Sequence, residues 1–316
     1  MTENNSEVKK GKFNGIVHGN ERIGEKFYRL GFEVNGEGGS LLSGFKPGQF
    51  VQLQVSKAGI PPDKAIPSAL SDVSQRDIIL RRPFSFCNIE VRENSTLCEI
   101  LYCVLGPSTL RMTTLSGGDT VSVIGPLGNG FWLPDGRKKV VLVAGGIGAA
   151  PLEFAGKYLT KNHSDIEIIA FAGAKTVDEL PFEGKLDDIS QNLGYSLAVF
   201  ARYGIESKIA TDDGSAGFRG TVLECFEQWH KQTDWETGEI VIYGCGPEVM
   251  LAKLSEIAGK EAIDCQVSME RRMACGIGVC QSCAVECKTP DSAKHENKLC
   301  CEDGPVFDSR EVVFRI

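Results

Sequence analysis

The chain of 316 residues lacks any apolar run of about 18 residues, so the sequence predicts no membrane-spanning helix. It also lacks an excess of positive charge: 34 lysines and arginines against 42 aspartates and glutamates give a net charge of −8, which does not favour nucleic-acid binding. Residues 1–11 lack the apolar core of a secretory signal, so we expect a flexible tail and a cytoplasmic protein. A chain of this length is expected to form two or three globular domains.

Cysteine, in contrast, is abundant, with 12 residues. Thiols stay reduced in the cytoplasm, so clustered cysteines there indicate ligation of a metal or an iron–sulfur cluster rather than disulfides. Cysteines that stand alone in apolar or strand-like surroundings are more simply explained as small buried hydrophobic residues. These are Cys87, Cys98, Cys103, Cys225 and Cys245.

Residues 12–133 contain short alternating or β-branched runs broken by glycine and proline, and this pattern predicts an antiparallel β-barrel or β-sandwich. Clear examples are Phe50–Val55, Ile100–Leu105 and Thr120–Ile124. Residues 56–80 interrupt the pattern with three prolines and scattered polar residues. We therefore expect a long loop or insertion there, without a regular element until about Asp77.

Residues 134–262 have a different texture, in which near-continuous apolar runs alternate with helix-like stretches. Apolar runs of this kind are typical of strands buried on both faces, and the alternation predicts a parallel α/β sheet. The expected strands are Val140–Ala144, Ile166–Phe171, Ser196–Ala201 and Ile240–Tyr243, and the expected helices include Leu152–Leu159 and Glu248–Ile257.

Residues 263–316 form a short, cysteine-rich segment that cannot bury much core and is expected to need a metal or another staple. Cys275, Cys280 and Cys283 have the C-x4-C-x2-C spacing of plant-type [2Fe–2S] proteins. The spacing leaves the fourth ligand open among the cysteines further along, and a structural zinc site is the alternative. The candidates for the fourth position are Cys287, Cys300 and Cys301.

Two glycines shape the predicted cluster loop. Gly276 and Gly278 allow its backbone to curl inward, because glycine adopts conformations that other residues avoid. The N–H groups of such a loop can donate hydrogen bonds to the sulfur atoms and tune the reduction potential.

A glycine-rich turn follows the expected strand Val140–Ala144 and precedes a helix pattern. Such a turn lets the backbone approach a pyrophosphate, with the helix N-terminus facing the negative charge. Its sequence, GGIGAAP over residues 145–151, differs from the usual GxGxxG, and by itself it is equally consistent with a tight turn in any α/β sheet. A second turn of small residues at 244–247 follows another strand, so the two turns are expected to flank one nucleotide at the carboxyl edge of the sheet.

The barrel segment also carries motifs that suit phosphate. Residues 81–85, RRPFS, join two arginines to a proline and a hydroxyl, and arginine matches phosphate with two parallel hydrogen bonds. Residues 106–109, GPST, precede a helix start whose amides can hold a second phosphate edge. Each motif alone is also consistent with a surface arginine pair or a turn.

Together these motifs, with PGQF at 47–50 and CGP at 245–247, resemble the ferredoxin–NADP reductase superfamily over residues 12–262. The whole chain resembles the electron-transfer subunits of class 1B, NAD-dependent dihydroorotate dehydrogenases, most closely in ERRMACGIGVCQSC, GPLGNGF, TDDGSAGFRG and CEDGPVF. The resemblance implies an FAD-binding β-barrel, an NAD-binding α/β domain and a small C-terminal [2Fe–2S] domain over residues 263–316.

The resemblance also implies which residues hold each cofactor. FAD would contact Arg82, Pro83, Phe84, Ser85, Gly106, Ser108 and Thr109; NAD(H) would contact Gly145, Gly146, Gly148, Gly246 and Pro247; and the cluster ligands would be Cys275, Cys280, Cys283 and Cys301. Ser108 departs from the family's G-x-G-T turn, because it replaces the second glycine. Asp212 and Asp213 are expected to disfavour the 2′-phosphate of NADP, whereas Lys175 and Arg202 would act in the opposite direction.

The function implied is electron transfer in pyrimidine biosynthesis. Electrons from the FMN of a separate dihydroorotate-oxidising subunit would pass through the cluster and FAD to NAD⁺, within a heterotetramer of two subunits of each kind. We expect no acid–base catalytic residue in this chain, and its four histidines are scattered. The alternatives are a flavin and iron–sulfur reductase that uses NAD(P)H to serve another redox partner, and a non-enzymatic docking module whose cysteines bind zinc.

Overall fold

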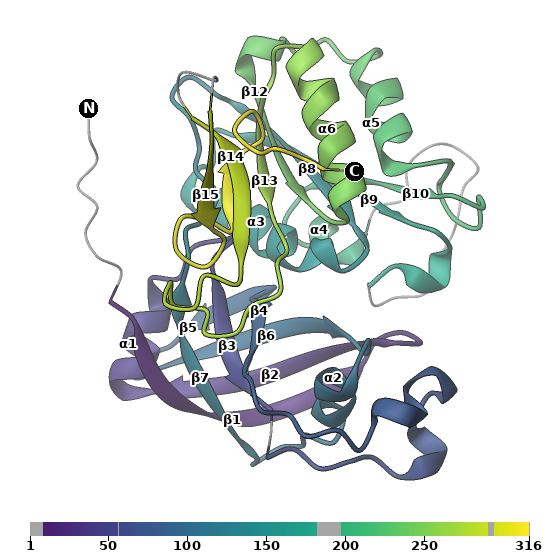
Figure 1. Ribbon diagram of the computed structural model, residues 1–316. Coiled ribbons are helices and arrows are strands. Elements are labelled where there is room, and N and C mark those ends of the chain that lie inside the picture. Colours follow the sequence, from purple (N-terminus) through teal and green to yellow (C-terminus); the bar gives the residue numbers. More distant parts are fainter. Residues whose placement is uncertain (1–8, 56, 182–196, 290–293, 316) are drawn as a thin grey trace.

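The computed structural model describes residues 9–55, 57–181, 197–289 and 294–315 (Figure 1). Residues 1–8 of the expected tail lie outside this range, and strand β1 begins at Gly11. Two large sheets lie at opposite ends of the molecule, and the C-terminal segment packs beside the junction between them.

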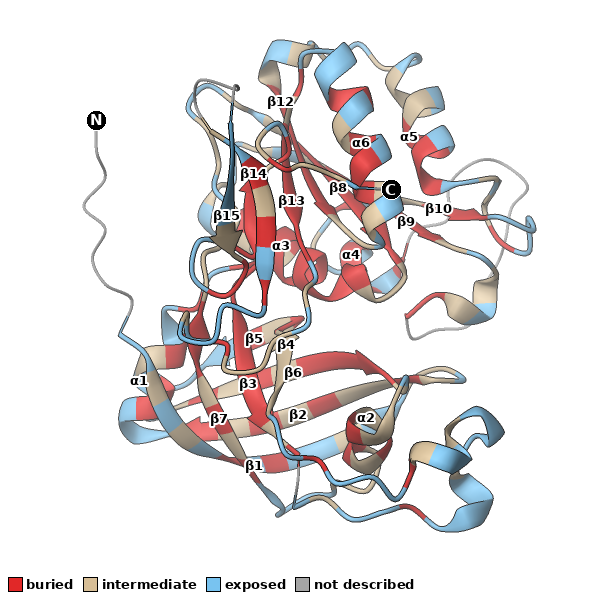
Figure 2. Cartoon of the chain, viewed as in Figure 1, coloured by how far each residue is buried: buried red, intermediate tan, exposed pale blue. Residues whose placement is uncertain are grey.

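The first sheet is the expected antiparallel barrel sheet, with strand order β4-β3-β7-β1-β2-β6-β5. It curls so that β4, at one edge, also lies against β6 near the other. Its strands turn alternate side chains inward, and Val51, Leu53, Val121 and Val123 are fully buried (Figure 2). The elements are β1 (Gly11–Arg22), β2 (Phe27–Asn35), α1 (Gly36–Ser43), β3 (Phe50–Gln54), β4 (Arg82–Ser85), β5 (Asn88–Val91), β6 (Ser95–Cys103), α2 (Pro107–Met112) and β7 (Thr120–Leu127).

The insertion between β3 and β4 is a largely exposed excursion with two short 3₁₀ helices, η1 (Asp63–Ala65) and η2 (Ser68–Val73). Each follows a proline, Pro62 and Pro67, and a preset φ near −60° suits the start of such a turn. The expectation of no regular element before Asp77 therefore missed these two turns.

The second sheet is the expected parallel sheet, with order β11-β10-β9-β8-β12-β13-β16. Helices α3 and α4 cover one face, and α5 and α6 cover the other (Figure 1). None of the described helices is both long and apolar enough to cross a membrane. The elements are β8 (Lys139–Gly145), η3 (Gly146–Gly148), α3 (Ala149–Asn162), β9 (Glu167–Ala174), η4 (Val177–Glu179), α4 (Ala198–Ala201), β10 (Glu206–Thr211), β11 (Phe218–Arg219), α5 (Val222–His230), η5 (Thr237–Glu239), β12 (Ile240–Cys245), α6 (Glu248–Lys260) and β13 (Asp264–Ser268).

One strand prediction in this domain is wrong. In the described part of the expected strand Ser196–Ala201, the chain forms the short helix α4, and the third strand of the sheet is β10. A short apolar run fits a buried strand and a buried helix equally well, so periodicity cannot separate them. Here Val199 and Phe200 pack on the face that α3 covers, and a turn at Gly204 (φ +71°) leads into β10.

The C-terminal segment is joined to the second sheet. β13 begins just beyond the boundary expected at residue 262 and extends the parallel sheet, and β16 (Val306–Asp308) then pairs antiparallel with it. A hairpin of β14 (Ala284–Lys288) and β15 (His295–Leu299) lies beside them. One continuous core contains side chains from both sheets and from this segment, among them Phe50, Val267, Cys283 and Cys301. The cluster loop is thus fixed against both larger domains.

Candidate functional site

A cleft lies between the barrel sheet and the carboxyl edge of the parallel sheet. It consists of two adjoining cavities of about 880 Å³ and about 560 Å³, which share wall residues from β4 and from the turn after β12. Every flavin or dinucleotide residue expected from the sequence lines one or both cavities. These residues are Arg82, Pro83, Phe84, Ser85, Gly106, Ser108, Thr109, Gly145, Gly146, Gly148, Gly246 and Pro247.

The two adjacent arginines have different surroundings. The Arg81 guanidinium donates to the carbonyl and the hydroxyl oxygens of Ser122 and to Oε1 of Gln54, so it is fixed on the barrel. Arg82 lines the larger cavity, and its Nη1 donates to the carbonyl oxygens of Leu80 and Arg81. Successive residues of a strand point to opposite faces, which accounts for the difference. Arg82 is therefore the arginine of this pair that lies at the cleft.

Ser108 and Thr109 also differ. The hydroxyl of Ser108 is buried and has no hydrogen-bond partner among the described residues, so it is available to donate a hydrogen bond to a bound phosphate. The hydroxyl of Thr109, in contrast, accepts hydrogen bonds from the amides of Leu105 and Gly106 and so holds its own turn together. Ser108 thus provides, at the position of the missing glycine, the free donor of this motif.

The two glycine turns of the parallel sheet are in direct contact. A Cβ atom at Gly148 would lie 2.2 Å from the carbonyl oxygen of Cys245 and 2.8 Å from the amide nitrogen of Gly246. No side chain fits between the turns, because the obstacle is backbone. The turn after β8 and the turn after β12 therefore form one surface at the start of α3, as the sequence predicts for a shared nucleotide site.

Sequence reasoning missed a third wall of the cleft. Residues 269–273 run from β13 towards the cluster loop, and Met269, Glu270, Arg271 and Met273 line both cavities. Arg271 forms a two-pronged ion pair with Glu248, at the start of α6, with distances of 2.9 and 3.1 Å. These residues are visible in the sequence as the ERRM that precedes the cysteine motif. Their position at the cleft could not be predicted, because it depends on tertiary packing.

In the cluster loop, backbone N–H groups converge on cysteine sulfur atoms. The amides of Ile277 and Cys280 donate to Sγ of Cys275, at 3.4 and 3.3 Å, and the amide of Gly278 donates to Sγ of Cys301, at 3.1 Å. Gly276 and Gly278 have φ of +70° and +83°, so the loop depends on the conformations that glycine allows. Hydrogen bonds from backbone amides to sulfur are among the features that set the reduction potential of an iron–sulfur cluster.

The structure separates the three candidates for the fourth ligand. Cys301 contacts the loop through Gly278, whereas the thiol of Cys300 donates to the carbonyl oxygen of Met269, at 3.2 Å, in the buried core. Cys287 is fully buried on β14, where it pairs with Val312. Among the described contacts, Cys301 is the candidate whose sulfur atom accepts a hydrogen bond from a loop amide, whereas Cys300 meets the motif through its backbone amide, which donates to the carbonyl oxygen of Cys283.

The thiols of the loop have unlike electrostatic surroundings. The hydroxyl of Ser282 lowers the pKa of the exposed Cys280 thiol to about 6, which favours the thiolate that binds metal. Burial raises the pKa of Cys301 to about 12, and the neighbouring Cys283 thiol adds to that rise. Among the described residues, no three His, Cys, Asp or Glu side chains are arranged to hold a metal ion, so the contacts above are pairwise.

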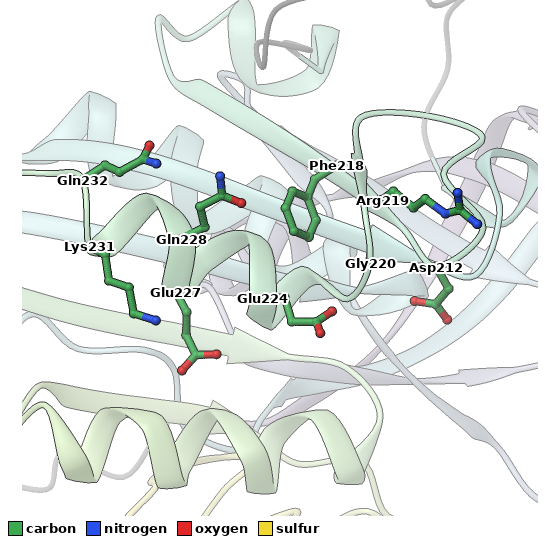
Figure 3. Close-up of a pocket in the computed structure, with 9 residues that line it drawn as sticks. All are labelled: Asp212, Phe218, Arg219, Gly220, Glu224, Glu227, Gln228, Lys231 and Gln232. Carbon is green, nitrogen blue, oxygen red and sulfur yellow. The ribbon is translucent and has the colours of Figure 1, made fainter.

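A separate groove of about 670 Å³ runs along α5 and shares no lining residue with the cleft (Figure 3). Asp212 and Arg219 lie at one end of the groove and Lys231 and Gln232 at the other. Asp212 follows the carboxyl end of β10, at the same edge of the sheet as the glycine turns. The adjacent Asp213 instead accepts hydrogen bonds from the amide and the hydroxyl of Ser215, at 2.9 and 2.6 Å.

Two comparisons with known proteins concern sequence. Residues 270–313 match the family model described as the iron–sulfur cluster binding domain of dihydroorotate dehydrogenase B. The chain is 33% identical, over 96% of its length and 99% of the relative's, to the electron transfer subunit of dihydroorotate dehydrogenase B (NAD(+)) from Caldanaerobacter subterraneus subsp. tengcongensis. It is 36% identical to the protein of that name from Bacillus caldolyticus, over 85% and 87% of the two chains.

The third comparison concerns solved structures. The fold is similar to a structure described as the NADH-dependent reduced ferredoxin-NADP oxidoreductase, with a TM-score of 0.69 and 23% identity over 95% of this chain and 90% of that one. It is also similar to a ferredoxin NADP⁺ reductase from Neisseria gonorrhoeae with bound FAD and NADP, with a TM-score of 0.55 and 16% identity over 83% and 95% of the two chains.

Proposed function

Because this chain belongs to the family of electron-transfer subunits of NAD-dependent dihydroorotate dehydrogenase B, we propose that it binds FAD, a [2Fe–2S] cluster and NAD(H) and passes electrons from dihydroorotate to NAD⁺. It is an oxidoreductase component with a reductase fold. The observation that carries the proposal is the single cleft lined by all the expected flavin and dinucleotide residues, with the cysteine loop packed beside it.

In this proposal each wall of the cleft has one task. Arg82 and the unpartnered hydroxyl of Ser108 would bind the flavin phosphates, and Pro83 and Phe84, which line both cavities, would contact the flavin. The contacting glycine turns at Gly148 and Gly246 hold the dinucleotide pyrophosphate against bare backbone. When bound, the cofactors supply the redox chemistry, and the protein supplies position, charge and exclusion of water. No acid–base catalytic residue is required.

The cluster ligands in this proposal are Cys275, Cys280, Cys283 and Cys301. The convergence of loop amides on Cys275 and Cys301 supports them, as does the lowered pKa of Cys280. The remaining candidates have buried side chains with other neighbours: Cys287 lies on β14 beside Val312, and the thiol of Cys300 donates to the carbonyl oxygen of Met269.

The partner in this proposal is an FMN-containing subunit that oxidises dihydroorotate, with two copies of each subunit in a heterotetramer. The relatives' name, electron transfer subunit, supports a separate catalytic subunit. The proposal also includes a cytoplasmic location, since all 12 cysteines are free of disulfides and thiols persist in reducing compartments.

The test is an anaerobic titration of the complex as it purifies from its own host. Dihydroorotate should bleach the visible absorbance of flavin and cluster, and NAD⁺ should restore it. NADH serves as the matched reductant, because it enters at the dinucleotide site and needs no catalytic subunit. If NADH bleaches the sample and dihydroorotate does not, the cofactor assignment stands and the proposed electron donor is wrong.

We expect Asp212→Asn to relax discrimination against NADPH. Asp212 lies outside the cleft but at the same edge of the sheet as the glycine turns, so in this proposal the adenosine ribose of the dinucleotide extends from the cleft to its carboxylate. The 2′-phosphate of NADPH would bring a second negative charge beside that carboxylate and so oppose binding. The ratio of kcat/KM for NADPH to that for NADH, measured by dye reduction, should rise at least about tenfold. Asp165→Asn makes the same charge change at an exposed site on the opposite edge of the sheet and should leave the ratio unchanged. An unchanged ratio in Asp212→Asn would remove that residue from the dinucleotide site.

A further inference from the structure

The carboxamide of Gln52 is the most completely buried polar group without a partner near the cleft. Gln52 lies on β3 and has 0% exposure, and neither Nε2 nor Oε1 has a hydrogen-bond partner among the described residues. A buried amide normally finds a partner, because its loss of hydration is otherwise uncompensated. An orphaned carboxamide at this position therefore requires an explanation.

The direction of the side chain follows from the strand. Val51 and Leu53 point into the barrel core, so Gln52 points to the opposite face, together with Phe50. Phe50 packs in the core that contains Cys283 and Cys301. Gln52 is thus directed out of the barrel and towards the cysteine segment.

The group that Gln52 meets there is the cluster loop itself. A Cβ atom at Gly276 would lie 2.3 Å from Nε2 of Gln52, so the carboxamide lies directly against the backbone between Cys275 and Ile277. Gly276 has a φ of +70°, and no side chain separates the amide from the loop. The same loop segment directs the amide of Ile277 at Sγ of Cys275.

Gln52 is also next to the flavin wall. In the pairing of β3 with β4, Gln52 lies opposite Pro83, which lines both cavities of the cleft. The residue therefore lies between the loop expected to hold the cluster and the strand expected to hold the flavin.

We propose that the Nε2–H of Gln52 donates a hydrogen bond to a sulfur atom of the cluster site, either the Cys275 thiolate or an adjacent sulfide. This hydrogen bond comes from the side of the cluster that faces the flavin strand, and it raises the reduction potential of the cluster. This inference rests on the proposed function, because it requires the loop to hold an iron–sulfur cluster. Reduction adds negative charge that spreads onto the sulfur atoms, so each donated hydrogen bond stabilises the reduced form. The backbone amides supply this effect from within the loop, and Gln52 supplies it from the barrel.

The experiment is a redox titration of the cluster by electron paramagnetic resonance in the intact complex. Gln52→Leu removes both polar atoms and keeps a side chain of similar size. We expect its midpoint potential to fall by an amount equivalent to about a tenfold change in the ratio of oxidised to reduced cluster, which is about 59 mV for a one-electron couple. Gln54→Leu is the matched control, since Gln54 lies on the same face of β3 and accepts a hydrogen bond from Arg81. Its potential should equal that of the wild type.

The outcomes separate this inference from the proposed function. A wild-type complex without iron, sulfide and a cluster signal overturns both. A wild-type complex with a cluster whose potential is the same in Gln52→Leu overturns the hydrogen bond alone, and lower thermal stability at unchanged potential would indicate a packing role. If Gln52→Leu does not retain the cluster, Gln52→Met decides, because methionine is unbranched and has no N–H: a lowered potential supports the donor, and an unchanged one rejects it.

Discussion

Replacing Cys301 with alanine is expected to remove the cluster from the complex, whereas replacing the adjacent Cys300 with alanine is expected to leave it in place. The two residues are neighbours in sequence, and both are buried. Their side chains point in different directions. Sγ of Cys301 accepts a hydrogen bond from the amide of Gly278 in the cluster loop, whereas the thiol of Cys300 donates one to the carbonyl oxygen of Met269. The first change removes a proposed ligand, and the second removes one weak hydrogen bond in the core.

The expected size of the effect follows from the role of a ligand. Loss of a group that only orients a metal ligand costs about 10–100-fold in affinity or activity, so loss of the ligand itself should cost at least about 100-fold in electron transfer from dihydroorotate to NAD⁺. Iron and acid-labile sulfide analysis of the purified complex measures the cluster directly. Flavin content and the reduction of a dye by NADH should survive in both variants, because neither requires the cluster.

The opposite pattern would reassign the ligand. If Cys300→Ala loses the cluster and Cys301→Ala keeps it, the chain uses Cys300, and the loop would have to rearrange to meet it. If both single variants keep the cluster and the double variant loses it, either sulfur can serve as the ligand.

Adjacent pairs mark the limit of what the sequence could predict here. Arg81 and Arg82 carry the same signal, yet Arg81 is fixed on the barrel by Ser122 and Arg82 lies at the cleft. Asp212 lines a groove, and Asp213 bonds its own loop at Ser215. A motif gives the chemistry of a pair, but the direction of each side chain is set by strand register and by the turn that follows, and these depend on tertiary packing.

Elements were predictable where local signals were strong. The apolar run at residues 140–144 and the glycine turn after it correspond to β8 and η3, because a buried strand followed by glycines has few alternative structures. The start of helix α5 also has a local signal in the sequence, a threonine followed three residues later by a glutamate. Thr221 and Glu224 form a capping box, in which the side chain of each accepts a hydrogen bond from the backbone amide of the other. The place of Gln52 against Gly276 had no local signal, since it joins residues more than 200 positions apart.

The interface between barrel and α/β domain contains a buried charge whose removal should be severely destabilising. The side chain of Glu153 on α3 is 1% exposed. Its carboxylate accepts hydrogen bonds from the guanidinium group of Arg29 on β2, at 3.1 and 3.3 Å, and from that of Arg202, which follows α4, at 2.5 Å. Burial raises the pKa of the Glu153 carboxyl group, and the two guanidinium groups oppose that rise. Burial alone would lower the pKa of Arg29, but the surrounding negative groups outweigh it and the net shift is upward. The guanidinium groups thus favour the charged form of Glu153, and the carboxylate favours the charged form of Arg29.

We expect Glu153→Ala to lower the free energy of unfolding by about 3–5 kcal/mol, because it removes the closest carboxylate from the largely buried Arg29 guanidinium, whose other described carboxylate partner, Glu99, lies farther away at 3.6 Å. Glu179→Ala is the matched control: Glu179 also joins the two domains, through Lys26 at 2.9 Å, but both side chains of that pair are more than a third exposed. An exposed pair of this kind contributes about 0–1 kcal/mol. Urea unfolding of the two variants, followed by flavin fluorescence and by circular dichroism, measures both costs. Because Arg29 belongs to the barrel sheet and Glu153 to helix α3 of the α/β domain, their ion pair joins the two domains that form the cleft. The flavin signal should therefore be lost in Glu153→Ala at a lower urea concentration than in the control. Equal costs for the two variants would mean that the buried network stabilises the interface no more than a solvated ion pair does.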